Sequence, residues 1–461
     1  MKKFRLQAFS QDGRFLKGCS LLSFASLLAF FLDIILFGAA GLGRIGFLTT
    51  RILFFALSVF FSLPLLLRQS KKLLSSRYVL LIVAFVVWVG ICAVRGFLAG
   101  NRRDIIKTDV FGYLNFLVLP TMLCVVNTKK RQRIMMWTVI AASAVMVLSA
   151  VVISFYPYFE TNTLSVYAFL QSTKIWAVTL MDGNATRVVM HTASRVFPVA
   201  FLLCAYLLFR SSSKKAFVGY TALMALLIVG VFLSYSRAFY AGAVLAVVAA
   251  IVIALLMKDP GTARLIKAAA AAVAAAVILI GGLSIAQETN LFRVAVYRVA
   301  FATATPGSSD DNFNPPDGFD DEMFQTEMES LSNRQLKLTL LWDSIEDNVV
   351  FGNGLGAAID LDDGYVEYSY QDIWNKMGLI GLLLFLAPFA DMTVCLFAQK
   401  KRAGHFPDFL QIAAWSVCLY FLFIAYFNPC MNTTVGIAHY LLAAVLFFQP
   451  EGSGKLPEAK I

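Results

Sequence analysis

The sequence predicts an all-α polytopic membrane protein with about twelve transmembrane helices and one large loop between the ninth and the tenth. Two observations on composition support this fold class. Of the 461 residues, 59% are hydrophobic and only 15% are charged, whereas a soluble domain has about 45–50% and about 25%. The third observation is that the apolar residues gather into blocks, many of which approach the roughly 20 residues that a spanning helix needs.

The apolar blocks follow one another with short polar connections. The basic N-terminus and its first apolar run resemble a signal peptide, but the run is long enough to span and more spans follow, so we predict a first transmembrane helix. The predicted spans are residues 16–38, 47–67, 78–99, 109–126, 134–156, 191–209, 216–233, 237–257, 264–286, 372–398, 409–427 and 433–449. This divides the chain into a membrane domain of helices 1–9 (residues 1–286), the large loop (287–371) and helices 10–12 (372–461).

The placement of charge predicts the orientation in the membrane. The formal net charge is +11, but the segment from Glu288 to Tyr370 carries −12 and the rest of the chain +23. The basic residues concentrate in alternate short connections, as in the cytoplasmic loops of membrane proteins. We therefore predict cytoplasmic termini, a large loop on the outer side, and no nucleic-acid partner.

One short connection breaks this charge pattern. It carries four basic residues on the predicted outer side: Arg95, Arg102, Arg103 and Lys107. Two interpretations stay open. Selection on charge is weak in this connection, or the four residues form an outer surface that attracts anions.

Cysteine and histidine give no sign of a metal site or a disulfide framework. Six of the seven cysteines lie inside apolar runs, no CxxC pair is present, and the three histidines are scattered. Spacings typical of zinc ligands or paired cysteines are therefore missing from the sequence.

The second half of the large loop, from Ser332 to Gly381, combines polar and apolar residues. Ser332 and Gln335 form a capping-box pattern, which predicts that an amphipathic helix begins there. Its apolar side consists of Leu338, Leu341, Trp342, Ile345 and Val349. The first half of the loop contains a Pro- and Asp-rich stretch at residues 308–319 that cannot form a core, so we predict poor order there.

A glycine turn and a second helix follow. The glycines at 352, 354 and 356 are not followed by Gly-Lys-Ser/Thr, so this turn is not a phosphate loop. In the next helix, helical spacing places five residues on one face, and we call them a stripe: Glu367, Gln371, Trp374, Gly378 and Gly381. The lower end of this stripe is reduced to glycine, which allows close contact between helices.

Four arginines are candidates for an anion site at the outer end of the membrane helices. Arg195 lies fifteen residues before the basic connection that follows it, roughly 22 Å of helix, so it falls below the outer surface of the membrane. Such an arginine is a functional candidate, with snorkelling to the surface as an equal alternative. Arg237 lies at the outer boundary of its span. We predict one cationic pocket formed by Arg187, Arg195, Arg237 and Arg334, because guanidinium groups bind diphosphate oxygens in pairs.

Three other residues inside predicted spans are unusual. Pro198 is predicted to kink the helix that carries Arg195. Asp33 and Asp391 are acidic residues within apolar blocks. Pairing between helices is the favoured role for both, with a proton relay as the alternative.

Three local patterns, in this order, resemble the O-antigen ligase and polymerase superfamily of membrane glycosyltransferases, the WaaL/Wzy type. The first is Ser236-Arg237 after an apolar helix, with Gly242 following. The second is a helix with Arg334 and Trp342 that leads into the turn GNGLG. The third is Glu367-Tyr368, then nine residues and the pair Gly378 and Gly381. Ligases of this family have histidine where this chain has Glu367.

The resemblance implies a GT-C-like fold in the bacterial cytoplasmic membrane and a metal-independent glycosyltransferase without a cofactor. The implied donor substrate of this glycosyltransferase is a glycan on a polyprenyl diphosphate, and the arginines bind the diphosphate leaving group. Glu367 takes the place of the group that activates the acceptor hydroxyl, which a desolvated carboxylate can do. The family also implies a flippase and a chain-length regulator as partners.

Three functions stay open at this point. The missing ligase histidine favours a polymerase of O-antigen, capsule or exopolysaccharide repeat units. A ligase that transfers the glycan to lipid A core or another acceptor is the first alternative, and a flippase of lipid-linked glycans is the second. The absence of an internal repeat gives no support to an inverted-repeat transporter.

Overall fold

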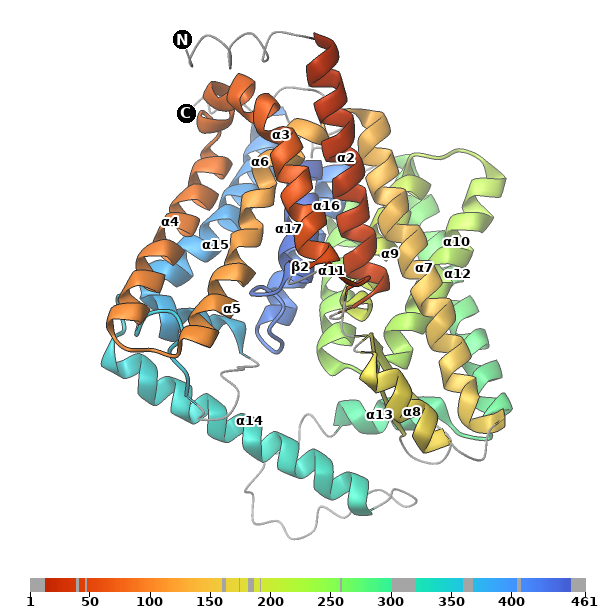
Figure 1. The fold of residues 1–461 in the computed structure, drawn as a ribbon. Helices are drawn as coiled ribbons and strands as arrows, with labels where there is room; N and C mark the ends of the chain where they lie inside the picture. Colours follow the sequence, from red (N-terminus) through yellow and green to blue (C-terminus); the bar gives the residue numbers. More distant parts are fainter. Residues whose placement is uncertain are drawn as a thin grey trace, which may run out of the picture.

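The computed structural model describes residues 13–38, 41–45, 48–159, 163–173, 175–180, 186–190, 192–257, 259–300, 321–359, 368–403 and 408–448. Within these ranges most residues are helical, and the described strands form two small hairpins (Figure 1). Successive apolar helices run in opposite directions, so their ends collect at two opposite ends of the molecule (Figure 1).

Nine helical stretches of the described chain are long and apolar enough to cross a membrane. They are α2 (Gly13–Leu36), α3 (Thr50–Leu74), α4 (Arg77–Leu98), α5 (Arg103–Leu114) continued through η1 (Asn115–Leu117) into α6 (Val118–Val125), α7 (Lys129–Phe159), α10 (Lys214–Leu233), α11 (Arg237–Met257), α12 (Pro260–Ala286) and α15 (Ser369–Ala403). Three apolar helices are shorter: α9 (Phe197–Phe209), α16 (Phe409–Ala425) and α17 (Thr434–Phe448).

The predicted all-helical polytopic membrane protein is thus confirmed. Every predicted apolar block is occupied by one of these helices, with the best agreement at 237–257, where α11 has the same bounds. Because three helices have 13, 17 and 15 residues, fewer than the roughly 20 of a full span, twelve crossings stay a prediction. The GT-C-like arrangement stays a prediction as well.

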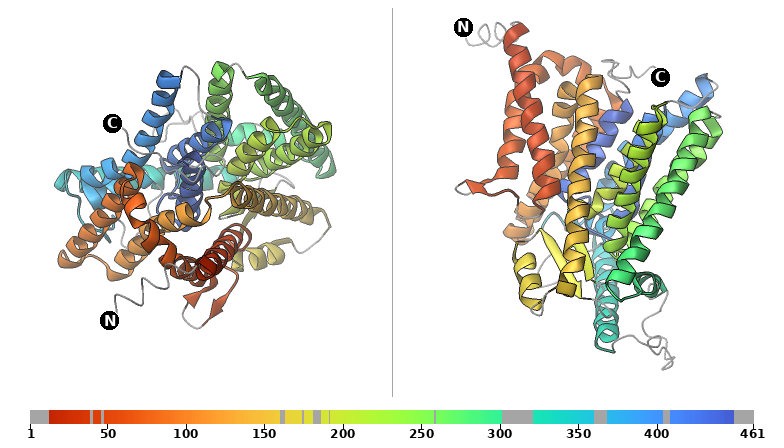
Figure 2. Two further views of the ribbon diagram at one scale, coloured as in Figure 1. Left: turned by 90° about the horizontal axis from the view of Figure 1, so that it is seen from above. Right: turned by 90° about the vertical axis from the view of Figure 1, so that its right-hand side faces the viewer.

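Helices α16 and α17 occupy the middle of the helix arrangement (Figure 2). Every residue of α17 after Thr434 is buried, as expected for a helix that is hydrophobic on all sides. Gly242 lets α11 approach this centre, because a Cβ there would lie 2.7 Å from Ile424 of α16. The two central helices are therefore surrounded by other helices, and the outer helices carry the exposed apolar surfaces.

The connections at one end of the molecule carry shorter elements, and we call this the loop end. They are α8 (Thr163–Ser172), the hairpin of β3 (Trp176–Leu180) and β4 (Thr186–Met190), the turn η2 (Ala193–Arg195), α13 (Leu291–Ala300) and α14 (Asp321–Asp347). A second hairpin joins α2 to α3 and consists of β1 (Arg44–Ile45) and β2 (Leu48–Thr49). The Pro- and Asp-rich stretch 308–319, predicted to be poorly ordered, lies outside the described residues.

Two predictions about helix starts are wrong. α14 begins at Asp321, so Ser332 is inside the helix and does not cap it, and Arg334 is not in the first turn. α9 begins at Phe197, which puts Pro198 in its first turn. Proline is tolerated there because the first helical N–H groups have no partner within the helix, so Pro198 starts the helix and does not kink it. Arg195 precedes the helix, in η2.

The connections at the opposite end are rich in lysine and arginine, and we call it the basic end. Arg264 of α12 donates to the carbonyls of Ser211 and Ser213, between α9 and α10. Arg131 of α7 donates to the carbonyl of Val125 at the end of α6, 2.8 Å away. Several of the predicted basic connections therefore lie together, away from α13 and α14 (Figure 1).

The two acidic residues predicted inside spans pair with arginines of neighbouring helices. Asp33 of α2 lies 3.1 Å from Arg51 of α3, and Asp391 of α15 lies 3.1 Å from Arg77 of α4. The predicted role in pairing between helices is confirmed for both.

Candidate functional site

The glycine turn, residues 351–356, docks into a break in α15. The break is at Gly378, whose φ of 68° and ψ of −177° are not helical. A Cβ at Gly378 would lie 2.1 Å from the carbonyl oxygen of Val350, and a Cβ at Gly352 would lie 2.4 Å from the nitrogen of Gly378. Both positions therefore need glycine, for close approach and for the left-handed φ. The predicted stripe from residue 367 to Gly381 is interrupted at this break.

The turn supplies the hydrogen bonds that the broken helix lacks. The N–H of Leu379 donates to the carbonyl of Val349 at 2.9 Å, and the carbonyls of Asn375 and Lys376 accept from the N–H groups of Asn353 and Gly354 at 2.7 and 3.0 Å. The indole of Trp88 donates to the carbonyl of Met377 at 2.9 Å. Irregular backbone within a membrane protein is tolerated only where such partners satisfy it, so turn and break form one unit.

The other side of the turn rests on the connection between α4 and α5. The guanidinium of Arg95 donates to the carbonyls of Phe351 and Gly352, and the amide of Asn101 donates to the carbonyls of Asn353 and Leu355 at 3.0 and 3.1 Å. Arg95 therefore holds the turn, a role that neither interpretation of this basic connection anticipated.

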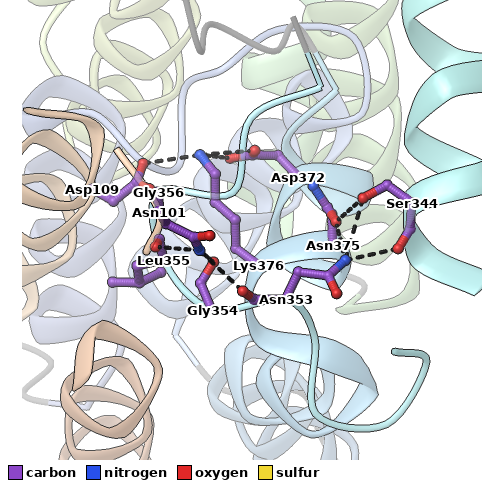
Figure 3. A network of polar contacts seen from close by, with 10 residues as sticks. All are labelled: Asn101, Asp109, Ser344, Asn353, Gly354, Leu355, Gly356, Asp372, Asn375 and Lys376. Atoms are coloured by element: carbon purple, nitrogen blue, oxygen red, sulfur yellow. Dashed lines mark hydrogen bonds and ion pairs between the residues drawn. The ribbon is translucent and has the colours of Figure 1, made fainter. Parts of the chain in front are cut away.

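Three buried charged residues tie this unit together (Figure 3). Nζ of Lys376 lies 3.0 Å from Oδ1 of Asp109 and 2.9 Å from Oδ1 of Asp372. Oδ2 of Asp109 accepts from the N–H of Gly356 at 3.0 Å. The three side chains are at most 7% exposed. This charged triad links α5, α15 and the glycine turn.

A set of polar side chains next to the triad anchors α14 (Figure 3). The amide oxygen of Asn375 accepts from Oγ of Ser344 at 2.8 Å and from Nδ2 of Asn353 at 2.9 Å. The same Nδ2 donates to the carbonyl of Ser344 at 2.7 Å. Arg334 lies ten residues before Ser344 on α14, about 15 Å along the helix, so these contacts fix the helix that carries it.

Three of the four predicted arginines come together at the loop end. Arg187 is on β4, Arg237 begins α11 and Arg334 is on α14. Burial lowers the pKa of the Arg187 guanidinium, and the positive charges of Arg334 and Arg237 lower it further. Mutual electrostatic influence of this kind requires the three cations to be near one another. We call Arg187, Arg237 and Arg334 the arginine cluster.

The backbone at this cluster is constrained. Nε of Arg187 donates to the carbonyl of Ser234 at 3.2 Å, in the turn that joins α10 to α11. In that turn, Tyr235 has a φ of 45° and is completely buried. Left-handed conformations of residues other than glycine cost about 1–3 kcal/mol and gather at functional sites. The strained turn directs the chain into α11, so that Arg237 is its first residue.

Arg195, the fourth predicted arginine, acts on the connection between α16 and α17. Its positive charge acts on Cys430, where it opposes the burial that raises the pKa of that thiol to about 12. Cys430 lies between α16 and α17, and Oγ of Ser369 donates to the carbonyl of Asn428 in the same connection at 3.0 Å. Arg195 and the start of α15 therefore meet the same connection. Glu367, the predicted catalytic residue, is two positions before Ser369 and lies outside the described residues.

An apolar groove of about 760 Å³ lies beside the arginine cluster. Its walls come from α9, α10, α11, α12 and α13, and include Phe201, Phe232, Tyr240, Val248 and Phe292. Tyr240 joins groove and cluster, because its hydroxyl donates to the carbonyl of Phe232 at 2.5 Å and the same phenol group acts electrostatically on Arg187. An apolar groove beside a group of cations suits an amphiphile with an anionic head.

No model of a known protein family matches this chain, and no curated protein matches it either. The resemblance to the ligase and polymerase superfamily therefore stays a prediction.

The sequence interpretation missed the charged triad. The signal was present, because Asp372 and Lys376 are four residues apart at the start of a predicted span and Asp109 begins another. Ionisable residues inside membrane segments are functional or structural candidates by default. Their pairing is tertiary, since 267 residues separate Asp109 from Lys376.

Proposed function

We propose that this protein is a membrane glycosyltransferase that polymerises glycan repeat units carried on polyprenyl diphosphate, at the outer face of the bacterial cytoplasmic membrane. The observation that carries the proposal is the arginine cluster beside the apolar groove, with Tyr240 between them. A polyprenyl diphosphate has the two matching parts, an anionic head and a long apolar tail. Arginine suits the head because its fork binds two oxygens at once and stays charged.

The proposed reaction is a displacement at the anomeric carbon of the donor glycan. The acceptor hydroxyl oxygen forms the new glycosidic bond, and the bond between the anomeric carbon and the diphosphate oxygen breaks. Polyprenyl diphosphate leaves with the electron pair, and Arg187, Arg237 and Arg334 stabilise the negative charge that develops on it. Glu367 accepts the proton of the acceptor hydroxyl in the proposed mechanism.

The anchoring of α14 has a role in this proposal. Arg334 belongs to a long loop, but the contacts of Ser344 and Asn353 with Asn375 hold its helix against α15. A cation held on a fixed element stabilises a transition state better than one that must be reoriented during the reaction. In this proposal, the glycine turn and the charged triad therefore serve to position α14 and its Arg334.

A flippase of lipid-linked glycans is the second candidate, and one observation favours it. The triad places an ammonium and two carboxylates among buried membrane helices, and such groups form proton relays in transporters. The contact of Asp109 with Gly356 and the position of Lys376 next to the break in α15 favour positioning over transport.

The lipid-linked glycans of a deletion strain test the proposal. A polymerase defect leaves single repeat units on the outer face of the membrane. Full-length chains that are not transferred to an acceptor would identify a ligase, and single units trapped inside would identify a flippase. The variant Glu367→Gln keeps size and hydrogen bonding but removes the base, so it is expected to match the deletion, while the neighbouring Asp362→Asn is expected to polymerise normally.

A further inference from the structure

A second large cavity lies at the basic end, away from the arginine cluster. Its volume is about 900 Å³, and it is formed mainly by the first turns of α7 and the end of α9, with single residues of α2 and α16. Its lining changes in character along its length, from charged at the rim to apolar deeper in the bundle. The proposed glycosyl transfer at the loop end makes no use of it.

The rim of this basic cavity carries four cations. Lys129, Lys130 and Arg133 come from the first turns of α7, and Arg210 follows the last turn of α9. All four are exposed, and none of the described residues that line the cavity is acidic. Cations in the first turn oppose the helix dipole, and like charges four residues apart repel. An anion placed between the two helices would reduce this repulsion.

The deeper part of the cavity is apolar. Along α7 it extends from Lys129 to Ala141, twelve residues or about 18 Å of helix. Leu32 of α2 and Trp137 of α7 line this part and are each 38% exposed. Tryptophan is enriched at the boundary between headgroups and hydrocarbon, and Trp137 lies eight residues below the first rim lysine. The space below the rim therefore suits an acyl chain that runs beside α7.

We infer that the basic cavity binds an anionic phospholipid, with the headgroup phosphate between the four rim cations and one acyl chain along α7. Basic pockets between transmembrane helices bind anionic headgroups in this way. A free phosphate makes no contact with the apolar part, and the cationic group of a zwitterionic lipid headgroup would be repelled by the rim cations. The bound lipid would join α7 to α9, the helix that follows Arg195, at the end remote from the proposed reaction.

The test is lipid retention by the full-length purified protein, measured by native mass spectrometry. The protein is first exchanged into detergent with equal amounts of phosphatidylglycerol and phosphatidylcholine. The wild type is expected to retain phosphatidylglycerol selectively. Arg133→Gln with Arg210→Gln is expected to lose about twenty-fivefold in affinity, from about fivefold for each cation removed near a membrane surface. The control pair Arg68→Gln and Lys71→Gln removes two exposed cations of α3 that do not line the cavity, and it is expected to retain the lipid.

Two further measurements separate the possible ligands. Ala141→Trp fills the apolar part without a change in charge, so it is expected to weaken lipid binding; unchanged binding would exclude the acyl-chain position. Addition of inorganic phosphate at a hundredfold excess is expected to leave the lipid bound, and its displacement would show a site for free phosphate only. Equal loss in the control pair, or equal retention of both lipids by the wild type, would overturn the inference. Size-exclusion profiles show whether each variant is folded.

Discussion

Replacing Lys376 with methionine removes the ammonium that lies between Asp109 and Asp372. Methionine keeps an unbranched, apolar side chain of similar length, so the change acts mainly on charge. Nζ of Lys376 is 3.0 Å from one carboxylate and 2.9 Å from the other. At these distances each pair attracts by about 5.5 kcal/mol if the effective dielectric constant is about 20, and this attraction offsets the cost of keeping the ions away from water.

The variant Lys376→Met leaves both carboxylates buried without this partner. Breaking a buried pair in this way costs about 3–5 kcal/mol of unfolding free energy. Lys267→Met is the matched control, because Lys267 is exposed on α12 and surface substitutions change stability by about 0.5 kcal/mol or less. Adding Asp109→Asn and Asp372→Asn to Lys376→Met removes the unpaired charges, so the triple variant is expected to recover part of the loss.

The measurement is the unfolding free energy of the purified protein in mixed micelles, followed by tryptophan fluorescence as the denaturing detergent fraction rises. The reasoning is refuted if Lys376→Met is no less stable than Lys267→Met. It is also refuted if the triple variant is much less stable than Lys376→Met, because the cost would then come from lost packing or hydrogen bonds and not from unpaired charge.

Three further predictions test the glycine break, the orientation and the arginine cluster. Gly378→Ala is expected to lower the unfolding free energy by at least about 1–3 kcal/mol, the cost of a residue with a Cβ in a backbone conformation that is almost exclusive to glycine, whereas Gly281→Ala in open space is expected not to lower it; equal effects would contradict the contact with the glycine turn. On a cysteine-free background, Ser332→Cys is expected to react with an impermeant thiol reagent in cells with a permeabilised outer membrane, and Ser213→Cys is not; the reverse labelling would overturn the orientation. Arg237→Lys is expected to impair turnover nearly as much as Arg237→Ala at unchanged protein level, because lysine lacks the bidentate fork; full activity of the lysine variant would exclude a diphosphate contact.

The apolar blocks predicted the helices well because the thickness of the bilayer fixes the length of a spanning helix. Local signals at helix starts were less reliable. Ser332 and Gln335 match a capping box, but α14 continues to Asp321, and a capping pattern inside a longer helix has no effect. Pro198 fits a kink and a helix start equally well in sequence, and only the position of η2 distinguishes the two.

The candidate site was predictable in part. Arg187, Arg237 and Arg334 come together as predicted, because their placement at one end follows from the alternation of spans and loops. Arg195 acts electrostatically on the connection between α16 and α17, a contact that the sequence did not predict. The packing of the glycine turn into the break at Gly378 was not predictable, since φ at a glycine is set by the neighbouring backbone, here Val350 and Phe351. From helical spacing alone, the sequence predicted a continuous helical stripe through Gly378.

Chain growth by the purified protein tests the central claim most directly. Single lipid-linked repeat units, extracted from the deletion strain, are added to the protein in phospholipid vesicles, and the chain lengths are read by gel electrophoresis. The proposal predicts a ladder of longer lipid-linked chains with the wild type, without added nucleotide sugar. It predicts single units only with Arg187→Ala, and a wild-type ladder with the exposed control Arg68→Ala. Single units with the wild-type protein under these conditions, or an undiminished ladder with Arg187→Ala, would contradict the account.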